Sequence, residues 1–411
     1  MMVVESLDTL YIMDLQDEYK EARDWIISSL NLDINHFTSV FETTIRLLGG
    51  LLSAFTLTHD PVFKDLSVDL ATRLLRSHTD GLHFVALAAS THSQANVNLQ
   101  TGDTRMEDSR VFLSEVGTNY LELSYLSAIS GDFSFVHAAE RIMTVLRRTP
   151  RLQGLLPLQV MTGWASGRTY GMGNRGDSYY EYLLKGWLLT GDEVLREEYC
   201  SSLQGLYSLL LTQSGRDGLF VVPDYHGSRQ RNMHHLACFL PGMLMLGAAS
   251  GACPDQQHDR ETAFKLMHAL DCLLSSAGPP TQAQTQTQTQ EHSSSRWKDL
   301  IPTGLTKYIL RPETVESLYV MYAKTRNPVF REWGWQIWST IKKRCKGRYG
   351  FADLHNVMHA DSDLDDRGET FFYSETLKYL YLLFSEDGPS YLDEYIFNTE
   401  AHLIQKQTRS L

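Results

Sequence analysis

The stretch "RGDSYYEYLLKGWLLTGDEVL", Arg175–Leu195, carries the pattern that decides the fold. It predicts a helix that begins at Asp177 and buries one face, because apolar residues recur at helical spacing. These residues are Tyr180, Leu183, Leu184, Trp187 and Leu188. A short polar turn at Asp192 follows, and a second helix begins after it. The stretch therefore predicts a helical hairpin.

The same order of elements recurs along the chain: an apolar helix, a polar turn with Asp or Asn, and an amphipathic helix. Hairpins of this kind cannot bury their apolar faces alone, so they must stack. They could form an open solenoid or a closed αα-toroid. The first helix of each pair is the more apolar, which favours a toroid with inner and outer layers. The turns centre on Asp60, Asp132, Asp192, Asp255, Asn327 and Asp387.

Composition narrows the class of protein. A formal net charge of -12 argues against a nucleic-acid partner, which needs a basic face. We find no apolar run of about 20 residues and no signal peptide, so we expect no membrane span, signal or anchor in this chain. The first residues already show the pattern of a helix, so we expect a natural N-terminal part to be missing. Five cysteines without C-x-x-C spacing argue against a zinc site.

One segment is of low complexity. Residues 279–296, "PPTQAQTQTQTQEHSSSR", are polar and cannot bury apolar surface, so they predict a disordered surface loop. The hairpin period resumes after this loop. We therefore expect one domain that spans residues 1–411.

Acidic residues stand at the starts of the expected inner helices. Each alone is explained by the helix dipole, which favours acids in the first turn. If the hairpins all run the same way round, these helix starts gather at one end of the toroid. Gathered carboxylates raise one another's pKa values or require a cation. Calcium binding and glycoside hydrolysis both use such an arrangement. The residues are Glu5, Glu42, Glu115, Asp177, Glu313, Glu316, Glu369 and Glu375, with His234 and His235 in the same position of another hairpin.

Six segments together resemble the class I α-1,2-mannosidases, glycoside hydrolase family 47. They are "FETTIRLLGGLLSAF", "RGDSYYEYLLKGWLLTGD", "HLACFLPG", "LRPETVESLYVMY", "ETLKYLYLLFS" and "FNTEAH". The resemblance implies an (αα)7 barrel with a short β or extended plug near the C-terminus. It also implies a monomeric, calcium-dependent, inverting enzyme. Such an enzyme removes α-1,2-linked mannose from high-mannose N-glycans in the lumen of the endoplasmic reticulum or Golgi.

The resemblance assigns roles to individual residues. Glu42 matches the general acid, Glu313 the proposed base and Asp177 a third catalytic carboxylate. Thr399 matches the calcium ligand, which binds through its hydroxyl and main-chain carbonyl. The waters of that ion would be held by Glu115, Glu316, Glu375 and Glu400. The sugar pocket would be formed by Arg46, Arg175, His235 and Phe371. The disulfide of the family would join Cys238 to Cys272.

Arg175 bears on specificity. Endoplasmic-reticulum-type members resemble this chain in having Arg at this position, whereas Golgi-type members carry Leu. We expect the guanidinium to favour one glycan branch, because it offers a rigid fork of donors to sugar hydroxyls. The simpler interpretation is that Arg175 only neutralises neighbouring acids.

The chain also departs from the family. His234 stands where the family usually has Asp, and the family's first outer helix is expected to be missing. Two alternatives to an active hydrolase therefore stay open. One is a mannose-binding barrel with weak or no catalysis, of the type that enhances endoplasmic-reticulum degradation. The other is an inactive truncated product. Retention of Glu42, Asp177, Glu313 and Thr399 favours the enzyme.

Overall fold

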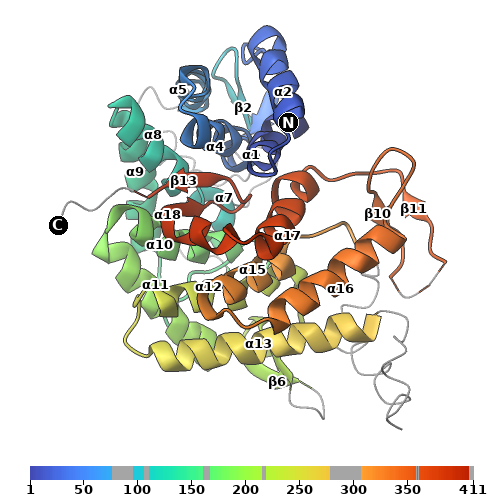
Figure 1. Ribbon diagram of the computed structural model, residues 1–411. Coiled ribbons are helices and arrows are strands. Elements are labelled where there is room, and N and C mark those ends of the chain that lie inside the picture. The colour runs from blue at the N-terminus through green and yellow to red at the C-terminus, as the bar shows by residue number, and fades with distance from the viewer. Residues whose placement is uncertain are drawn as a thin grey trace. The chain divides into compact units, whose positions relative to one another are not determined.

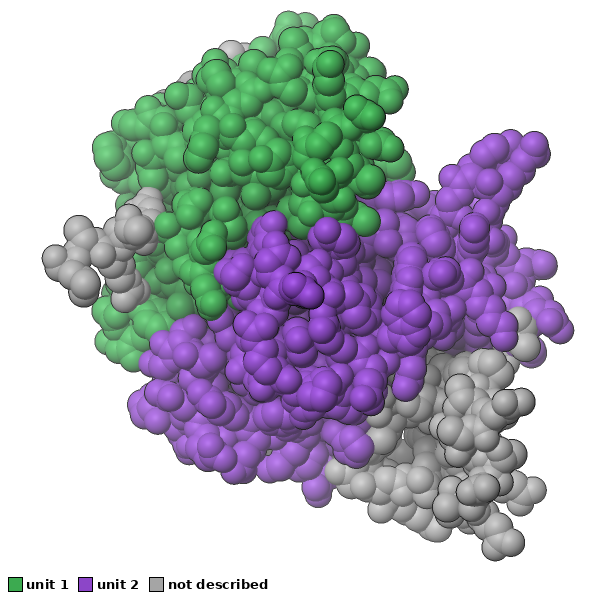
Figure 2. Space-filling view, in the orientation of Figure 1, with its two compact units in different colours: residues 1–171, 175–205, 392–411 green, residues 172–174, 206–391 purple. Residues whose placement is uncertain are grey.

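The computed structural model describes residues 1–75, 96–105, 111–160, 167–214, 219–277, 307–357, 359 and 361–406. The chain divides into two compact units, which Figure 2 colours separately. Unit 1 contains residues 1–171, 175–205 and 392–411, and unit 2 contains residues 172–174 and 206–391. The loop predicted at 279–296 lies outside the described residues.

Unit 1 is built from helical hairpins, as predicted. The first helices pack on one another in chain order, α1 against α4, α4 against α8 and α8 against α10. The first helices α8 and α10 are buried on nearly every side, whereas α2 and α9 bury one face. The pairs are α1 (Met2–Ile12) with α2 (Gln16–Ser29), α4 (Gly49–Thr58) with α5 (Pro61–Leu75), α8 (Tyr120–Ser130) with α9 (Ser134–Arg148), and α10 (Asp177–Thr190) with α11 (Glu193–Gly205) (Figure 1).

Short elements complete unit 1. The π-helix η1 (Thr43–Leu48) joins α3 (Val40–Glu42) to α4. The antiparallel hairpin of β12 (Tyr395–Phe397) and β13 (Leu403–Gln405) contacts α4, α8 and α10, so the expected C-terminal β plug is present. Other short strands pair antiparallel: β1 (Phe37–Ser39) with β2 (Asn96–Asn98), β2 with β3 (Thr104–Arg105), and β4 (Val111–Phe112) with β5 (Gln159–Val160). The helix α7 (Leu113–Gly117) follows β4 directly.

One described helix, Val40–Thr58, is long and apolar enough to cross a membrane by length and composition alone. The sequence pattern predicts no such stretch, and this one qualifies although it contains Glu42 and Arg46. In its most apolar window 61% of the residues are buried inside the structure, as in the core helix of a globular domain. We therefore interpret it as the core helix of unit 1.

Unit 2 repeats the hairpin arrangement. Helix α12 (Leu240–Ala249) packs on α13 (Gln256–Ala277) and on α15 (Glu313–Thr325), and α15 packs on α16 (Val329–Arg344) and α17 (Leu377–Phe384). Figure 1 shows α13 as the long yellow helix of this unit. The remaining elements are η3 (Leu206–Leu210), β6 (Thr212–Ser214), β7 (Leu219–Val221), β8 (Pro223–Tyr225), β9 (Arg229–Met233), η4 (His235–Phe239), β10 (Asp353–Leu354), β11 (Leu364–Asp365), η7 (Phe372–Thr376) and η8 (Gly388–Ser390); α18 (Tyr391–Glu394) crosses the boundary between the units.

The predicted turns have one shared mechanism. In five of them the side chain of Asp or Asn accepts a hydrogen bond from a backbone N–H at the start of the following helix. This bond satisfies a donor that the helix itself leaves unpaired. The bonds run from Val62 to Asp60 (3.1 Å), Ser134 to Asp132 (2.9 Å), Val194 to Asp192 (2.9 Å), His258 to Asp255 (3.1 Å) and Val329 to Asn327 (3.1 Å).

Candidate active site

The sequence-predicted site residues lie at or just before the first helix of a hairpin, or in the C-terminal hairpin. Those in unit 1 are Glu42, Arg46, Glu115, Arg175, Asp177, Thr399 and Glu400. Those in unit 2 are His235, Glu313, Glu316, Phe371 and Glu375.

Arg46 gathers three carboxylates in unit 1. Its Nε donates to Oε2 of Glu42 at 2.6 Å, and its Nη1 donates to Oε2 of Glu400 at 2.9 Å and of Glu5 at 3.4 Å. Burial alone would lower the pKa of Arg46, but Glu400, Glu42 and Glu5 outweigh it and raise the pKa above its ordinary value. Arg46 therefore acts as the permanent countercharge of this acidic cluster. The Glu42 side chain remains 45% exposed and can meet a substrate.

Asn398 holds the turn that carries Thr399. Its Oδ1 accepts from the backbone N–H groups of Glu400 and His402, both at 2.9 Å. Its Nδ2 donates to the carbonyl oxygen of Ile45 and to Oε1 of Glu122, both at 2.8 Å. All four hydrogen-bonding positions of a fully buried amide are used. Asn398 thereby joins the C-terminal turn to the helix of Glu42 and Arg46.

The local backbone explains this contact. Ile45 lies in the π-helix η1, and π-helical turns of this kind are frequent at functional sites. Gly49 allows the turn to approach the helix, because a Cβ there would lie 2.6 Å from Nδ2 of Asn398. The turn ends on Ala401, whose φ of 59° lies in the left-handed region. Nearby, Nδ1 of the buried His402 lies 2.9 Å from Oδ2 of Asp8.

Glu122 is a buried acid that the sequence analysis did not single out. Tyr182 donates its hydroxyl to Oε1 of Glu122 at 2.6 Å, the same oxygen that Asn398 contacts. Oε2 of Glu122 has no hydrogen-bond partner among the residues that the structure describes. Burial raises the pKa of Glu122 to about 7. An acid within the otherwise apolar pattern of "YLELSYL" was the available signal.

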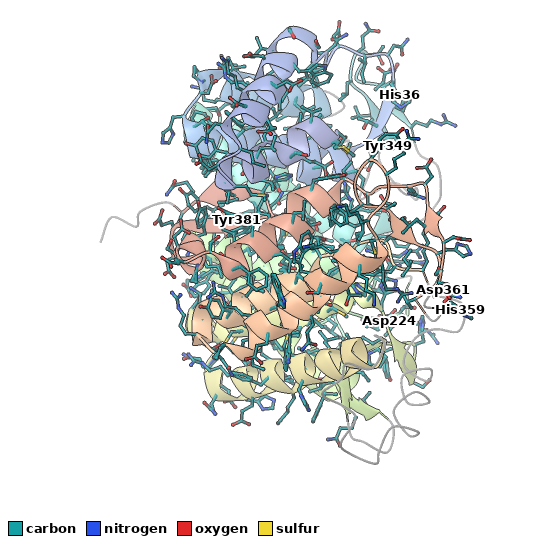
Figure 3. The ribbon with its side chains drawn as sticks, turned by 45° about the vertical axis from the view of Figure 1, so that its right-hand side comes forward. His36, Asp224, Tyr349, His359, Asp361 and Tyr381 are labelled. Carbon is teal, nitrogen blue, oxygen red and sulfur yellow. The ribbon has the colours of Figure 1, made fainter. Side chains whose placement is uncertain are left out.

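The residues at Thr399 fit a hard cation. Within the described ranges the Thr399 hydroxyl makes no hydrogen bond, while its backbone N–H donates to the hydroxyl of Tyr182 at 3.5 Å. A threonine hydroxyl and a main-chain carbonyl are oxygen ligands of the kind that calcium takes. The described residues contain no group of three or more His, Cys, Asp or Glu that could hold a metal, and His359 and Asp361, labelled in Figure 3, form no such group. An ion at Thr399 would therefore need water or substrate oxygens as well.

Asp177 is the first residue of α10, and Oδ1 accepts from the backbone N–H of Ser178 at 2.9 Å. Arg175 precedes it with a φ of 74°, which is uncommon for a residue with a long side chain. The guanidinium of Arg175 lies over the ring of Phe112, with Cζ 3.9 Å from the ring centroid. The turn thus presents an exposed cation and a half-buried carboxylate two residues apart.

Glu313 of unit 2 is a buried carboxylate with His235 and Arg311 as neighbours. Oε2 lies 3.0 Å from Nδ1 of His235, and Nη1 of Arg311 donates to Oε1 at 3.4 Å. Burial alone would raise the pKa of Glu313, but His235 and Arg311 lower it below its ordinary value. Glu313 is therefore a carboxylate at neutral pH, the form that a general base requires.

His234 forms the cap of η4, where Nδ1 accepts from the backbone N–H of Leu236 at 3.3 Å. Burial, and then the charge of Arg311, lower the pKa of His234. The residue that replaces the expected Asp is therefore a neutral imidazole that serves the backbone.

The other predicted residues of unit 2 flank the helices α15 and α17. The hydroxyl of Tyr379 lies 3.5 Å from Oε1 of Glu316. Glu375 is buried in the π-helix η7, and Phe371 is half-buried directly before it. A second π-helix therefore carries a predicted site residue, as η1 does in unit 1.

The predicted pairing of Cys238 with Cys272 is wrong in this structure, because Cys238 is a buried free thiol. Burial raises its pKa to about 12, and its carbonyl oxygen accepts from the hydroxyl of Ser317 at 2.6 Å. Cys238 is thus enclosed against α15, and the side chain of Cys272 lies outside the described part of the chain. Cys200 and Cys253 are disulfide-bonded instead.

Comparison with known proteins agrees with these features. The profile of glycosyl hydrolase family 47 matches residues 1–406. The chain belongs to glycosyl hydrolase family 47. Among its relatives, mannosyl-oligosaccharide 1,2-alpha-mannosidase IC of Homo sapiens is 35% identical over 97% of the chain and 62% of its own length. Mannosyl-oligosaccharide alpha-1,2-mannosidase IA of Drosophila melanogaster is 36% identical over 97% of the chain and 60% of its own length.

The family 47 chain thus spans about three fifths of the length of these two relatives. A third relative, the endoplasmic reticulum mannosyl-oligosaccharide 1,2-alpha-mannosidase of Schizosaccharomyces pombe, is 36% identical over 98% of the chain and 80% of its own length. Among solved structures, alpha-1,2-mannosidase from Trichoderma reesei matches with a TM-score of 0.83 and 24% identity, over 99% of this chain and 90% of that one. The predicted fold, an (αα)7 barrel of helical hairpins, is confirmed.

The Asn398 amide yields a prediction about stability. Asn398→Ala should lower the free energy of unfolding by about 3 kcal/mol, because it leaves buried backbone and carboxylate groups without partners. Urea denaturation measures the change. Asn31→Ala removes an exposed amide that accepts one backbone hydrogen bond at 2.9 Å, and serves as the control with a loss below about 1 kcal/mol. Equal losses in the two variants would contradict the role given to Asn398.

Proposed function

We propose that this chain hydrolyses terminal α-1,2-linked mannose from high-mannose N-glycans, with inversion at the anomeric carbon. Membership of family 47 over nearly the whole chain carries the proposal, together with the retained carboxylates Glu42, Asp177 and Glu313. The names of the relatives describe enzymes that act on mannosyl-oligosaccharides. We further propose one catalytic domain, a monomer, and a place in the lumen of the secretory pathway.

The proposed chemistry assigns one proton transfer to each of two carboxyl groups. Glu42 donates its proton to the glycosidic oxygen of the leaving group, and Glu313 takes a proton from the attacking water. The ionised state of Glu313 suits this second role, because a base must be unprotonated before it acts. Asp177 supplies a third carboxylate, and Arg175, Arg46, His235 and Phe371 contact the sugars.

Calcium enters the proposal through Thr399. Its hydroxyl and main-chain carbonyl would hold the ion, and Glu115, Glu316, Glu375 and Glu400 would hold its waters. When bound, calcium supplies a site for sugar hydroxyls, since it accepts six to eight oxygen ligands. Two features support this assignment: the Thr399 hydroxyl makes no hydrogen bond to a described residue, and Asn398 fixes the turn that carries it.

The proposed reaction is tested with a high-mannose glycan and the purified chain. Proton NMR should show β-mannose as the first product. Glu313→Gln should lower kcat by about 10²–10⁴-fold while substrate affinity changes little, because the variant loses proton transfer. Glu332→Gln, on the exposed face of α16, is the matched control. Binding without mannose release would favour the mannose-binding alternative, and an α product would contradict inversion.

The charges around Glu313 predict a pH effect. Arg311 lowers the pKa of Glu313, so Arg311→Met should raise it. The base is active only when ionised, and the acidic limb of kcat/KM should therefore move to higher pH in this variant. Arg348→Met removes an equal charge from an exposed turn and should leave the limb in place. An unshifted limb in Arg311→Met would count against Glu313 as the base.

Calcium is tested by binding as well as by activity. Chelation should abolish hydrolysis, and added calcium should raise the melting temperature, because the ion binds only the folded chain. Thr399→Val should reduce the calcium-dependent rise in melting temperature, whereas Thr340→Val, on the exposed face of α16, should keep it. Full activity after dialysis against excess chelator would exclude this role for the ion.

A further inference from the structure

The two candidate sugar-binding arginines of unit 1 differ in what their guanidinium groups contact. Arg46 is ion-paired with Glu42, Glu400 and Glu5. Arg175, by contrast, makes no side-chain hydrogen bond or ion pair to any residue that the structure describes. The interpretation that Arg175 merely neutralises acids therefore has no contact to support it. The donors of Arg175 remain available for a ligand.

The Arg175 backbone is fixed in an unusual conformation. Its φ of 74° costs about 1–3 kcal/mol for a residue other than glycine, so the surroundings must impose it. The backbone N–H of Ser114 donates to the carbonyl oxygen of Arg175 at 3.0 Å. Gly176 lies close to the strand region as well, because a Cβ there would meet Cδ2 of Leu158 at 2.5 Å. The turn of Arg175 and Gly176 thus packs closely against the segments that flank β4 and β5.

Phe112 belongs to this same support. It ends β4, pairs with Gln159 of β5, and is only 6% exposed. The backbone N–H of the next residue, Leu113, donates to the carbonyl oxygen of Leu158 at 3.0 Å. Burial and strand pairing therefore hold the ring in place beneath the guanidinium. A guanidinium stacked on a ring keeps its N–H donors at its edge, free for hydroxyl groups.

We propose that Phe112 is a positioning residue that sets which terminal α-1,2-linked mannose is removed, by holding the Arg175 guanidinium in one orientation. The inference rests on the proposed function. A branch that places its hydroxyls against the fixed donors gains hydrogen bonds. A branch that presents them elsewhere leaves polar groups unpaired, which is the strong form of rejection.

The test compares Phe112→Leu, Arg175→Leu and the double variant on a glycan that has several terminal α-1,2-linked mannoses. Chromatography over time gives the ratio of product isomers. We expect wild type to favour one isomer and Phe112→Leu to weaken that preference about three- to tenfold, from the strength of a cation–π contact. Arg175→Leu should weaken it at least as much. The double variant should match Arg175→Leu alone, because the ring acts only through the guanidinium.

Two controls separate positioning from loss of structure. Phe112→Tyr keeps a ring under the guanidinium and should restore the wild-type isomer ratio. Tyr349, labelled in Figure 3, also lies beside an arginine, with Arg348 5.0 Å from its centroid, but it is 89% exposed. Tyr349→Leu should therefore leave the ratio unchanged. Wild-type ratios in Phe112→Leu, or additive effects in the double variant, would overturn the inference.

Binding distinguishes failure of the inference from failure of the proposed function. Calorimetry with the separated product isomers measures selectivity without catalysis. If wild type releases no mannose but prefers one isomer, and Phe112→Leu loses that preference, the positioning role stands while the hydrolase proposal fails. If wild type neither cleaves nor discriminates among the isomers, both are refuted.

Discussion

The buried amide of Asn398 is the constraint on which the candidate site of unit 1 depends. It satisfies two backbone N–H groups of the C-terminal turn, one carbonyl oxygen of the π-helix η1, and the carboxylate of Glu122. A shift of the turn that broke these bonds would leave buried polar groups without partners, which is costly. The position of Thr399 relative to the helix of Glu42 and Arg46 is therefore set by hydrogen bonding in the core.

Two arginines of unit 1 have different roles because their guanidinium groups have different neighbours. Three carboxylates surround Arg46, so its charge serves the acidic cluster and allows several acids to share a small volume. Arg175 lies over a ring, and none of the described residues takes up the hydrogen-bonding capacity of its guanidinium. A similar contrast holds among the histidines of unit 2. His235 contacts Glu313, whereas His234 caps a helix turn through Nδ1.

Much of the helical architecture could be predicted from sequence because it depends on local rules. Apolar spacing predicted the hairpins, and in five of the six turns an Asp or Asn caps the next helix as its residue type predicts. The start of α10 at Asp177 was also predicted correctly, although Gly176 and not Asp177 occupies the N-cap position. The network of Asn398, Glu122 and Tyr182 could not be predicted, because its members lie far apart in sequence and no spacing rule links them. The predicted disulfide of Cys238 is wrong, because the burial of this thiol against α15 depends on tertiary packing that the sequence pattern does not show.

The two ends of the chain meet inside unit 1. His402 contacts Asp8 across nearly the whole sequence, and the strand β13 lies against α4 and α8. During synthesis the ribosome must therefore deliver residues 206–391 before unit 1 receives its last hairpin. Until then Asp8 of α1 and Glu122 of α8 lack the contacts that His402 and Asn398 supply, and the nascent chain exposes an unfinished interior. Folding of unit 1 can therefore be completed only after residues 206–391 have been translated. During this interval chaperones can bind the exposed interior of the incomplete unit.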